Sequence, residues 1–136
     1  MKVGVSACLL GQKCRYDGSD CKREKLMELL ASHEVIPVCP ECLAGFSVPR
    51  EPIEIQNGKI ISKSKKDLTL DLEIGVQKAM QLLKEQEVEM VILKNKSPSC
   101  GANWIYDGNF CGHLVQGDGF FAKALKKNGF FILQVD

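Results

Sequence analysis

Residues 90–101 have the sequence Met-Val-Ile-Leu-Lys-Asn-Lys-Ser-Pro-Ser-Cys-Gly, in which a short apolar run is followed by a polar turn that ends in a cysteine. An apolar run without polar alternation is typical of a strand that is covered on both faces of a sheet. The chain contains four such runs, which predict four buried strands: Lys2–Ser6, Glu34–Val38, Met90–Leu93 and Phe130–Val135.

The segments between these runs show the periodicity of amphipathic helices, with apolar residues three or four positions apart. The predicted helices are Lys22–Ser32, Leu72–Gln86 and Gly119–Lys127, and Asn128-Gly129 is a typical end for the last of them. Strands that alternate with helices imply parallel βαβ units. The pattern therefore predicts an α/β fold, a mainly parallel, Rossmann-like sheet flanked by helices, in a single domain over residues 1–136.

Two segments depart from this alternation. Val48–Asp71 carries prolines near its start and the turn pair Asn57-Gly58, which predicts an irregular excursion with a small β-hairpin. Trp104–Leu114 predicts a second excursion, which turns at Asp107-Gly108.

The composition is that of an ordinary soluble domain, with 136 residues of which 45% are hydrophobic and 26% charged. The formal net charge of +1 indicates no strong field, so neither nucleic acid nor an anionic membrane is expected as a partner. Lys63, Lys65 and Lys66 cluster in what is interpreted as a solvated loop. No segment has the ~18 to 20 apolar residues of a membrane span, and the N-terminus lacks the pattern of a signal peptide. A cytoplasmic location is expected.

Seven cysteines are many for this length, and their number is odd. In a reducing compartment they indicate metal or redox chemistry more than a disulfide framework. Cys8, Cys39 and Cys100 each fall just past the C-terminal end of a predicted strand. Because ligand crevices in open parallel sheets lie outside the carboxyl ends of the strands, we expect these three thiols at one edge. They suit a soft metal or an iron–sulfur cluster, in which one iron would remain free for substrate.

Other interpretations of the cysteines stay open. Cysteine is common as a small buried core residue. A structural zinc ribbon would carry two Cys-x-x-Cys pairs, whereas only Cys39 and Cys42 have that spacing. Cys14 is a fourth candidate, which could replace one of the three ligands or accept sulfur as a nearby thiol. Cys21, Cys42 and Cys111 have weaker contexts and are interpreted as structural.

Polar residues beside these cysteines complete the predicted site. Glu41 follows Cys39 and the stiff Pro40, and a carboxylate at that place could carry protons for the attack of water. Ser97 and Ser99 flank Pro98 before Cys100, where either hydroxyl could position a substrate or a water, or only satisfy the turn. Weaker expectations concern turns at Asp17 and Asp107, a loop anchor or anion contact at Arg50, crevice contacts by Lys94 and Asn95, and no shared motif for His33 and His113.

Five segments, in this order, resemble the DUF523 family, which includes the thiouracil desulfurase (desulfidase) group: Ser6–Gly11, Cys14–Gly18, Pro37–Glu41, Ser97–Gly101 and Ile105–Gly108. The resemblance implies a [4Fe-4S] cluster bound by three cysteines and the conversion of 2-thiouracil to uracil and sulfide without net redox change. By similarity, the ligand role passes to Cys8, Cys39 and Cys100, and the acid/base role to Glu41. Ser97 would support them, with Ser99 as its substitute.

The stretch Cys42–Phe46 departs from the Gly-Gly-Leu run of the family and adds a thiol beside the site. The expected partner is a small thiolated molecule, a thiopyrimidine. Two further hypotheses are a metal-independent sulfurtransferase that carries persulfide on Cys8 or Cys14, and a non-enzymatic protein in which zinc or a cluster stabilises the fold or senses oxidation. Glu41 and the two serines favour the enzyme, since a structural site needs neither.

Overall fold

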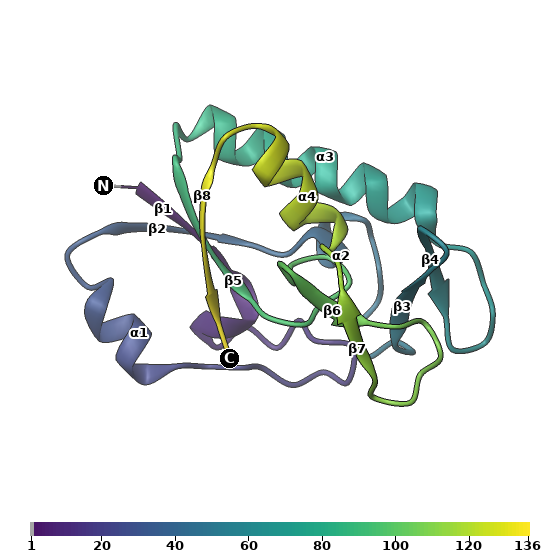
Figure 1. Ribbon diagram of the computed structural model, residues 1–136. Coiled ribbons are helices and arrows are strands. Elements are labelled where there is room, and N and C mark those ends of the chain that lie inside the picture. The colour runs from purple at the N-terminus through teal and green to yellow at the C-terminus, as the bar shows by residue number, and fades with distance from the viewer. Residues whose placement is uncertain (1) are drawn as a thin grey trace.

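The structure is a computed structural model that describes residues 2–136, and its centre is a four-stranded parallel sheet (Figure 1). The strands lie in the order β2-β1-β5-β8, so that β1 and β5 have neighbours on both sides. Their bounds are Lys2–Ser6 for β1, Glu34–Val38 for β2, Met90–Lys94 for β5 and Phe131–Val135 for β8. The predicted α/β fold with a parallel sheet is confirmed.

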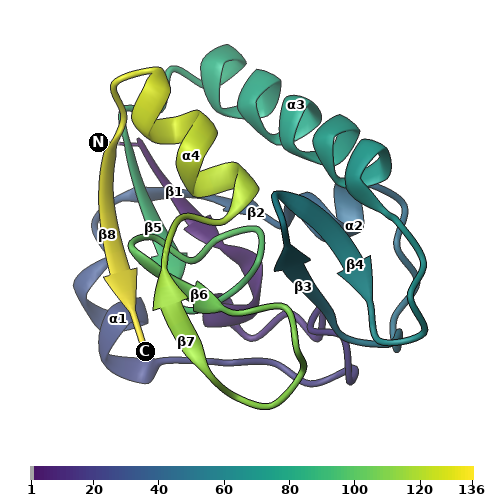
Figure 2. The same ribbon diagram turned by 45° about the vertical axis from the view of Figure 1, so that its right-hand side comes forward.

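Helices cover both faces of the sheet, as Figure 2 shows. On one face α3 (Thr69–Glu85) and α4 (Phe120–Lys127) pack over β1 and β5, together with the short α2 (Pro40–Leu43). On the other face lie η1 (Ala7–Leu10) and α1 (Glu24–Leu29). The buried face of α3 carries the apolar residues that its periodicity predicts: Leu72, Val76, Ala79, Met80 and Leu83. The core therefore consists of two apolar layers with the sheet between them.

Two antiparallel hairpins project from the side of the sheet where the central strands end. The first pairs β3 (Ile53–Gln56) with β4 (Lys59–Ser62), and its turn is the predicted Asn57-Gly58, both residues having positive φ angles of 51° and 76°. These angles match the type I′ geometry of a two-residue hairpin. The second pairs β6 (Trp104–Tyr106) with β7 (Leu114–Gln116). Both predicted excursions are thus hairpins, and the second is closed by the longer loop 107–113.

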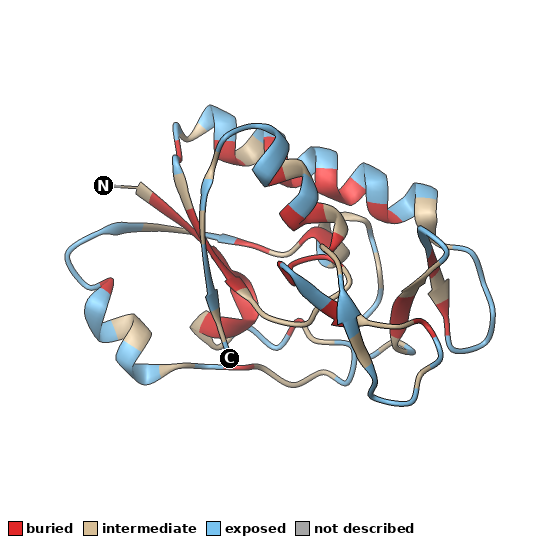
Figure 3. Cartoon of the chain, in the orientation of Figure 1, coloured by how far each residue is buried: buried red, intermediate tan, exposed pale blue. Residues whose placement is uncertain are grey.

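Burial differs from the prediction at the two outer strands. The expectation that all four strands are buried is wrong for β2 and β8, which are the edges of the sheet. On β8, Phe131 is 77% and Leu133 is 52% exposed, and Figure 3 shows the burial concentrated on the central strands and the inner helix faces. One reason is that α1 has six residues, not the predicted eleven of Lys22–Ser32, and buries none of them fully. That face of the sheet is incompletely covered.

Two short elements were not predicted, namely η1 and α2, each of four residues. They matter because they carry Cys8 and Glu41. The position of α2 depends on Gly75, since a Cβ there would lie 2.2 Å from the carbonyl oxygen of Pro40. Glycine thus lets α3 lie directly on α2. Among residues 2–136, no helix is both long and apolar enough to cross a bilayer.

Candidate active site

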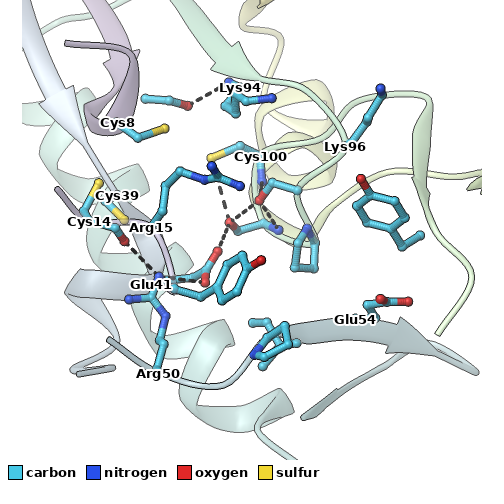
Figure 4. Close-up of a pocket in the computed structure, with 18 of the residues that line it drawn as sticks. Cys8, Cys14, Arg15, Cys39, Glu41, Arg50, Glu54, Lys94, Lys96 and Cys100 are labelled. Carbon is cyan, nitrogen blue, oxygen red and sulfur yellow. Dashed lines mark hydrogen bonds and ion pairs between the residues drawn. The ribbon is translucent and has the colours of Figure 1, made fainter. Parts of the chain in front are cut away.

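A cavity of about 370 Å³ lies outside the carboxyl ends of β1, β2 and β5 (Figure 4). The strand ends supply one wall, through Ser6–Cys8, Cys39 and Glu41, and the run 96–100. The β3–β4 and β6–β7 hairpins supply the opposite wall, through residues such as Ile53, Glu54 and Tyr106. This is the place where open parallel sheets bind ligands.

The three predicted cluster ligands all line this cavity. Cys8 lies in η1 and is 9% exposed, Cys39 directly precedes α2, and Cys100 ends the loop after β5 and is 6% exposed. All seven cysteines are free. Within residues 2–136, no group of three or more Cys, His, Asp or Glu side chains is arranged to hold a single metal ion.

Cys14 shares the cavity and contacts two of these thiols. Its pKa is raised to about 12: the hydrogen bond with Cys39 lowers it, but the hydrogen bond with Cys8, burial, and the charges of Cys8 and Cys42 raise it more. The same contact is the largest cause that raises the pKa of Cys39, followed by burial. Cys14 is thus a direct neighbour of two predicted ligands, and the sequence-based choice between ligand and nearby thiol stays a prediction.

Cys100 is the third predicted ligand, and it is buried. The pKa of Cys100 is raised to about 12, mainly by burial, although a hydrogen bond with Ser6 lowers it in part. Cysteine binds metals as thiolate, so a cationic centre that enters this site must displace protons from these thiols. Uptake of a metal centre is therefore coupled to proton release.

Glu41 lies in the first turn of α2 and holds the polar network of the site. Its Oε1 accepts a hydrogen bond from Arg50 at 3.0 Å, and its Oε2 accepts one from the Ser99 hydroxyl at 2.8 Å. The ion pair is largely shielded, since the side chains of Arg50 and Glu41 are 9% and 14% exposed. Arg50 also donates to the carbonyl of Cys14 at 3.0 Å. It therefore fixes the carboxylate and the Cys14 loop together, which confirms the loop-anchor expectation for Arg50.

Both predicted serines belong to this network. The hydroxyls of Ser97 and Ser99 are 2.9 Å apart, and because Ser99 donates its single proton to Glu41, Ser97 is the donor to Ser99. Ser97 Oγ also accepts the backbone N–H groups of Ser99 and Cys100, each at 3.1 Å. Ser99, not Ser97, touches Glu41 directly. The result is a hydrogen-bonded chain from Ser97 through Ser99 to the carboxylate.

The loop that carries these serines is held by α4. The N–H groups of the first turn of a helix have no partner within the helix. Here Phe120 donates to the Pro98 carbonyl at 2.9 Å, and Phe121 donates to the Ser99 carbonyl at 2.8 Å. A Cβ at Gly119 would lie 2.5 Å from the Ser99 carbonyl oxygen, so only glycine permits this approach. A rigid helix thus fixes the serine pair.

The weaker expectations have mixed outcomes. Lys94 lines the cavity, and burial lowers its pKa, whereas Asn95 contacts the Lys94 ammonium from outside the cavity. Lys63, Lys65 and Lys66 are all exposed, as predicted for a solvated loop, and Lys63 also borders the cavity. Asp17 and Asp107 accept hydrogen bonds from the residues two positions later, as predicted for turns, and His33 and His113 lie outside the lining of the cavity.

None of the residues Cys42–Phe46, where the sequence departs from the family, lines the cavity. Cys42 is exposed, lies outside the lining, and its thiol approaches the Cys14 carbonyl at 4.0 Å. Cys111 is likewise exposed, whereas Cys21 is buried, so a core role fits only Cys21. Several lining residues were not predicted at all, among them Arg15, Tyr16, Glu54, Tyr106 and Phe110.

The family model of 2-thiouracil desulfurase matches residues 3–136. The chain belongs to this family. The DUF523 resemblance of the five motifs is therefore confirmed, and the geometry described above is that of a 2-thiouracil desulfurase family member.

Two relatives extend the comparison for this member of the 2-thiouracil desulfurase family. The uncharacterized protein YbbK of Bacillus subtilis (strain 168) is 40% identical over 139 residues, covering 95% of this chain and 92% of YbbK. The solved structure of TudS, a [4Fe-4S]-dependent thiouracil desulfidase, is 36% identical with a TM-score of 0.91, covering 98% of this chain and 89% of that chain. The fold and the family are thus shared over nearly the whole length.

Proposed function

We propose that this protein is a [4Fe-4S]-dependent desulfidase that converts the thiocarbonyl group of a small thiolated compound, such as 2-thiouracil, to a carbonyl group and sulfide. The observation that carries this proposal is one cavity with two kinds of groups. Cys8, Cys39 and Cys100 come from three strand ends, and Glu41 is hydrogen-bonded to Arg50 and Ser99 beside them. Membership of the 2-thiouracil desulfurase family and the likeness to TudS support it.

The residues present fit a [4Fe-4S] cluster, since thiolates from cysteine are its usual ligands and three of them surround one cavity. Cys8, Cys39 and Cys100 would hold it. When bound, the cluster supplies a thiophilic, Lewis-acidic iron for the sulfur of the substrate. Three cysteine ligands would leave one iron without a protein ligand, in the manner of an open catalytic metal site.

The side chains of the chain itself supply proton transfer. Replacing a thiocarbonyl sulfur by oxygen consumes one water and releases hydrogen sulfide, with no change in oxidation state. Glu41 is the group that would take the proton from the attacking water and return it to the departing sulfur. Arg50 holds Oε1, so Oε2, which faces Ser99, is the oxygen positioned for the transfer. Ser97 and Ser99 extend the path by which a proton could reach that oxygen.

The rest of the lining suits a flat heterocycle. Tyr16, Tyr106 and Phe110 line the cavity, and aromatic side chains commonly stack on or border planar rings. We therefore infer a thiopyrimidine as substrate, and the net charge of +1 supports a small molecule as the partner more than a nucleic acid. Seven free cysteines and an oxygen-sensitive cluster support a cytoplasmic location, where thiols stay reduced.

The test is anaerobic reconstitution with iron and sulfide, followed by metal analysis and an assay of sulfide and uracil formed from 2-thiouracil. We expect broad absorption near ~400 nm and about four irons per chain. Cys8→Ala, Cys39→Ala and Cys100→Ala should each lose most of the iron, whereas Cys111→Ala, which changes an exposed cysteine, should keep it.

Full iron content in all three cavity variants would refute the ligand assignment. A loaded wild-type protein that releases no sulfide from any thiopyrimidine would favour the non-enzymatic alternative. Desulfuration by protein that contains no iron would favour the metal-independent sulfurtransferase.

A further inference from the structure

Glu54 is a buried carboxylate of the cavity that the chemistry above does not use. It lies on β3, is 8% exposed, and lines the same cavity as Glu41 and the cysteines. Figure 4 shows Glu54 across the cavity from Cys8, Cys14 and Cys39. Because an ionised side chain loses its hydration in such a place, a buried carboxylate is rare unless bonded partners compensate it.

Only one oxygen of this carboxylate is compensated within residues 2–136. Glu54 Oε1 accepts the backbone N–H groups of Gly108 at 3.0 Å and Phe110 at 3.2 Å. Oε2 has no hydrogen-bond partner in this part of the chain, and none of its ion pairs includes Glu54. Among residues 2–136, Oε2 is not one of the fully buried polar atoms that lack a partner, so it is accessible from the space around it. Since Glu54 lines the cavity, Oε2 is available to a molecule bound there.

The hydrogen bonds between Glu54 and the loop 107–113 do not explain why a carboxylate, and not an amide, stands at position 54. The loop already lies tightly on β3, where a Cβ at Gly108 would be 2.7 Å from the Ile55 carbonyl oxygen. Gln56 adds a further hydrogen bond, to the Gly108 carbonyl, at 3.4 Å. The carbonyl oxygen of a glutamine at position 54 would accept the same two N–H groups without burying a charge. The second oxygen is therefore the feature that needs a role.

We propose that Glu54 determines substrate specificity by accepting, through Oε2, a hydrogen bond from a ring N–H group of the thiolated heterocycle. This inference rests on the proposed function and names the chemistry that the cavity selects. An ionised carboxylate only accepts hydrogen bonds, so it favours cyclic thioamides and thioureas that keep a free ring N–H group. An analogue alkylated at that nitrogen leaves Oε2 buried and unpaired, which is the condition under which enzymes discriminate strongly.

The experiment combines one protein substitution with one substrate substitution. Glu54→Gln keeps an oxygen for Gly108 and Phe110 but replaces the second acceptor by an NH2 donor. In the loaded wild-type enzyme, kcat/KM should fall about 10- to 100-fold when one of the two ring nitrogens of 2-thiouracil is methylated. Glu54→Gln should lower kcat/KM for unmethylated 2-thiouracil by a similar factor, mainly through KM, and should abolish the penalty of that methyl group. Such non-additivity identifies a direct contact.

Three controls separate recognition from folding. Glu73→Gln makes the same change on the exposed face of α3 and should alter neither kinetic constant. Glu54→Gln should melt near the wild-type temperature, whereas Glu54→Ala should melt lower because it removes the acceptor of both loop N–H groups. Iron content should be unchanged in Glu54→Gln.

Binding of uracil, measured by calorimetry on the loaded protein, distinguishes a failure of this inference from a failure of the proposed function. If 2-thiouracil is not desulfurated but uracil binds at least ten times more weakly to Glu54→Gln than to wild type, the proposed function fails and the role of Glu54 stands. Wild-type turnover and uracil binding in Glu54→Gln overturn the role of Glu54 alone. So does a methyl penalty of equal size in both proteins. Absence of uracil binding to the wild type overturns it too.

Discussion

Replacing Glu41 by Gln tests whether the hydrogen-bonded network beside the cysteines is catalytic. The size of the effect on stability can be estimated from the contacts of Glu41. Both neighbours of the carboxylate are donors: Arg50 at Oε1 and Ser99 at Oε2. The amide of glutamine offers a single acceptor oxygen, so its NH2 group must face one of these donors. One hydrogen bond is lost and the buried Arg50 has no counter-charge. We expect a loss of stability of about 1 to 3 kcal/mol, seen as a fall of several degrees in Tm.

The catalytic effect of Glu41→Gln should be larger than its effect on folding. A positioned carboxylate contributes ~10²- to 10⁴-fold to proton transfer. The desulfuration rate should therefore fall at least ~100-fold, a loss of about 2.7 kcal/mol in transition-state stabilisation, at normal iron content. Ser99→Ala removes a donor but leaves the carboxylate ionised and paired with Arg50, so its cost should be smaller.

The assay is sulfide release from 2-thiouracil by anaerobically loaded protein, normalised to iron and measured well below Tm. In the double variant Glu41→Gln/Ser99→Ala, the second substitution should cost little, because the group through which Ser99 acts is already gone. Turnover by Glu41→Gln within about threefold of wild type would refute the acid/base assignment. A rate loss that only parallels a loss of iron would instead make Glu41 a residue that supports the metal site.

Two further predictions test the neighbouring elements. Cys14→Ser should keep the iron content of the wild type but lose activity, because the thiol of Cys14 contacts Cys8 and Cys39 and is not assigned as a ligand. Iron content is measured in parallel with Cys8→Ala. An equal loss of iron in the two variants would show that Cys14 is a ligand. Gly75→Ala places a Cβ 2.2 Å from the Pro40 carbonyl oxygen and should cost about 1 to 3 kcal/mol of stability, measured by denaturant unfolding, and reduce activity because α2 must shift. Lys78→Ala, on the exposed face of the same helix, should change stability by less than about 0.5 kcal/mol, and an equally small effect of Gly75→Ala would contradict the close packing.

The parallel sheet and its main helices could be predicted because their signals are long and periodic. β1 and β2 begin and end at the predicted residues, and α3 buries the predicted apolar face. η1 and α2 have four residues each, fewer than a periodic pattern requires, so their formation depends on neighbours such as Gly75. The exposure of β8 could not be predicted either, because an apolar strand has the same sequence pattern whether or not a helix covers its second face.

The site divides in the same way. The place of Cys8, Cys39 and Cys100 at the cavity could be predicted from their positions after strand ends, since parallel strands bring their ends to one edge. Glu54 could not, because it stands between Ile53 and Ile55 in a pattern of alternating apolar and polar residues, which predicts an outward-facing side chain. In the structure Ile53 and Glu54 are both buried, since the loop 107–113 covers the face of β3 that the alternation assigns to solvent. Contacts between two segments that are far apart in the chain, such as β3 and the loop 107–113, produce no pattern in the local sequence of either.

The residues of the proposed site come from two parts of the chain, the strand ends and the β3–β4 hairpin. The ends of β1, β2 and β5 hold the thiols and Glu41, and they are fixed by the sheet and by α3 and α4. Arg50 precedes the β3–β4 hairpin and Glu54 lies on it, so the orientation of the Glu41 carboxylate and the proposed recognition of the ring both depend on how that hairpin docks. In the proposed function, the cluster ligands and the residue that recognises the ring therefore lie in different parts of the chain. Substitutions in the hairpins should change which thiolated heterocycle is accepted while iron content stays constant, because none of the three assigned ligands lies there.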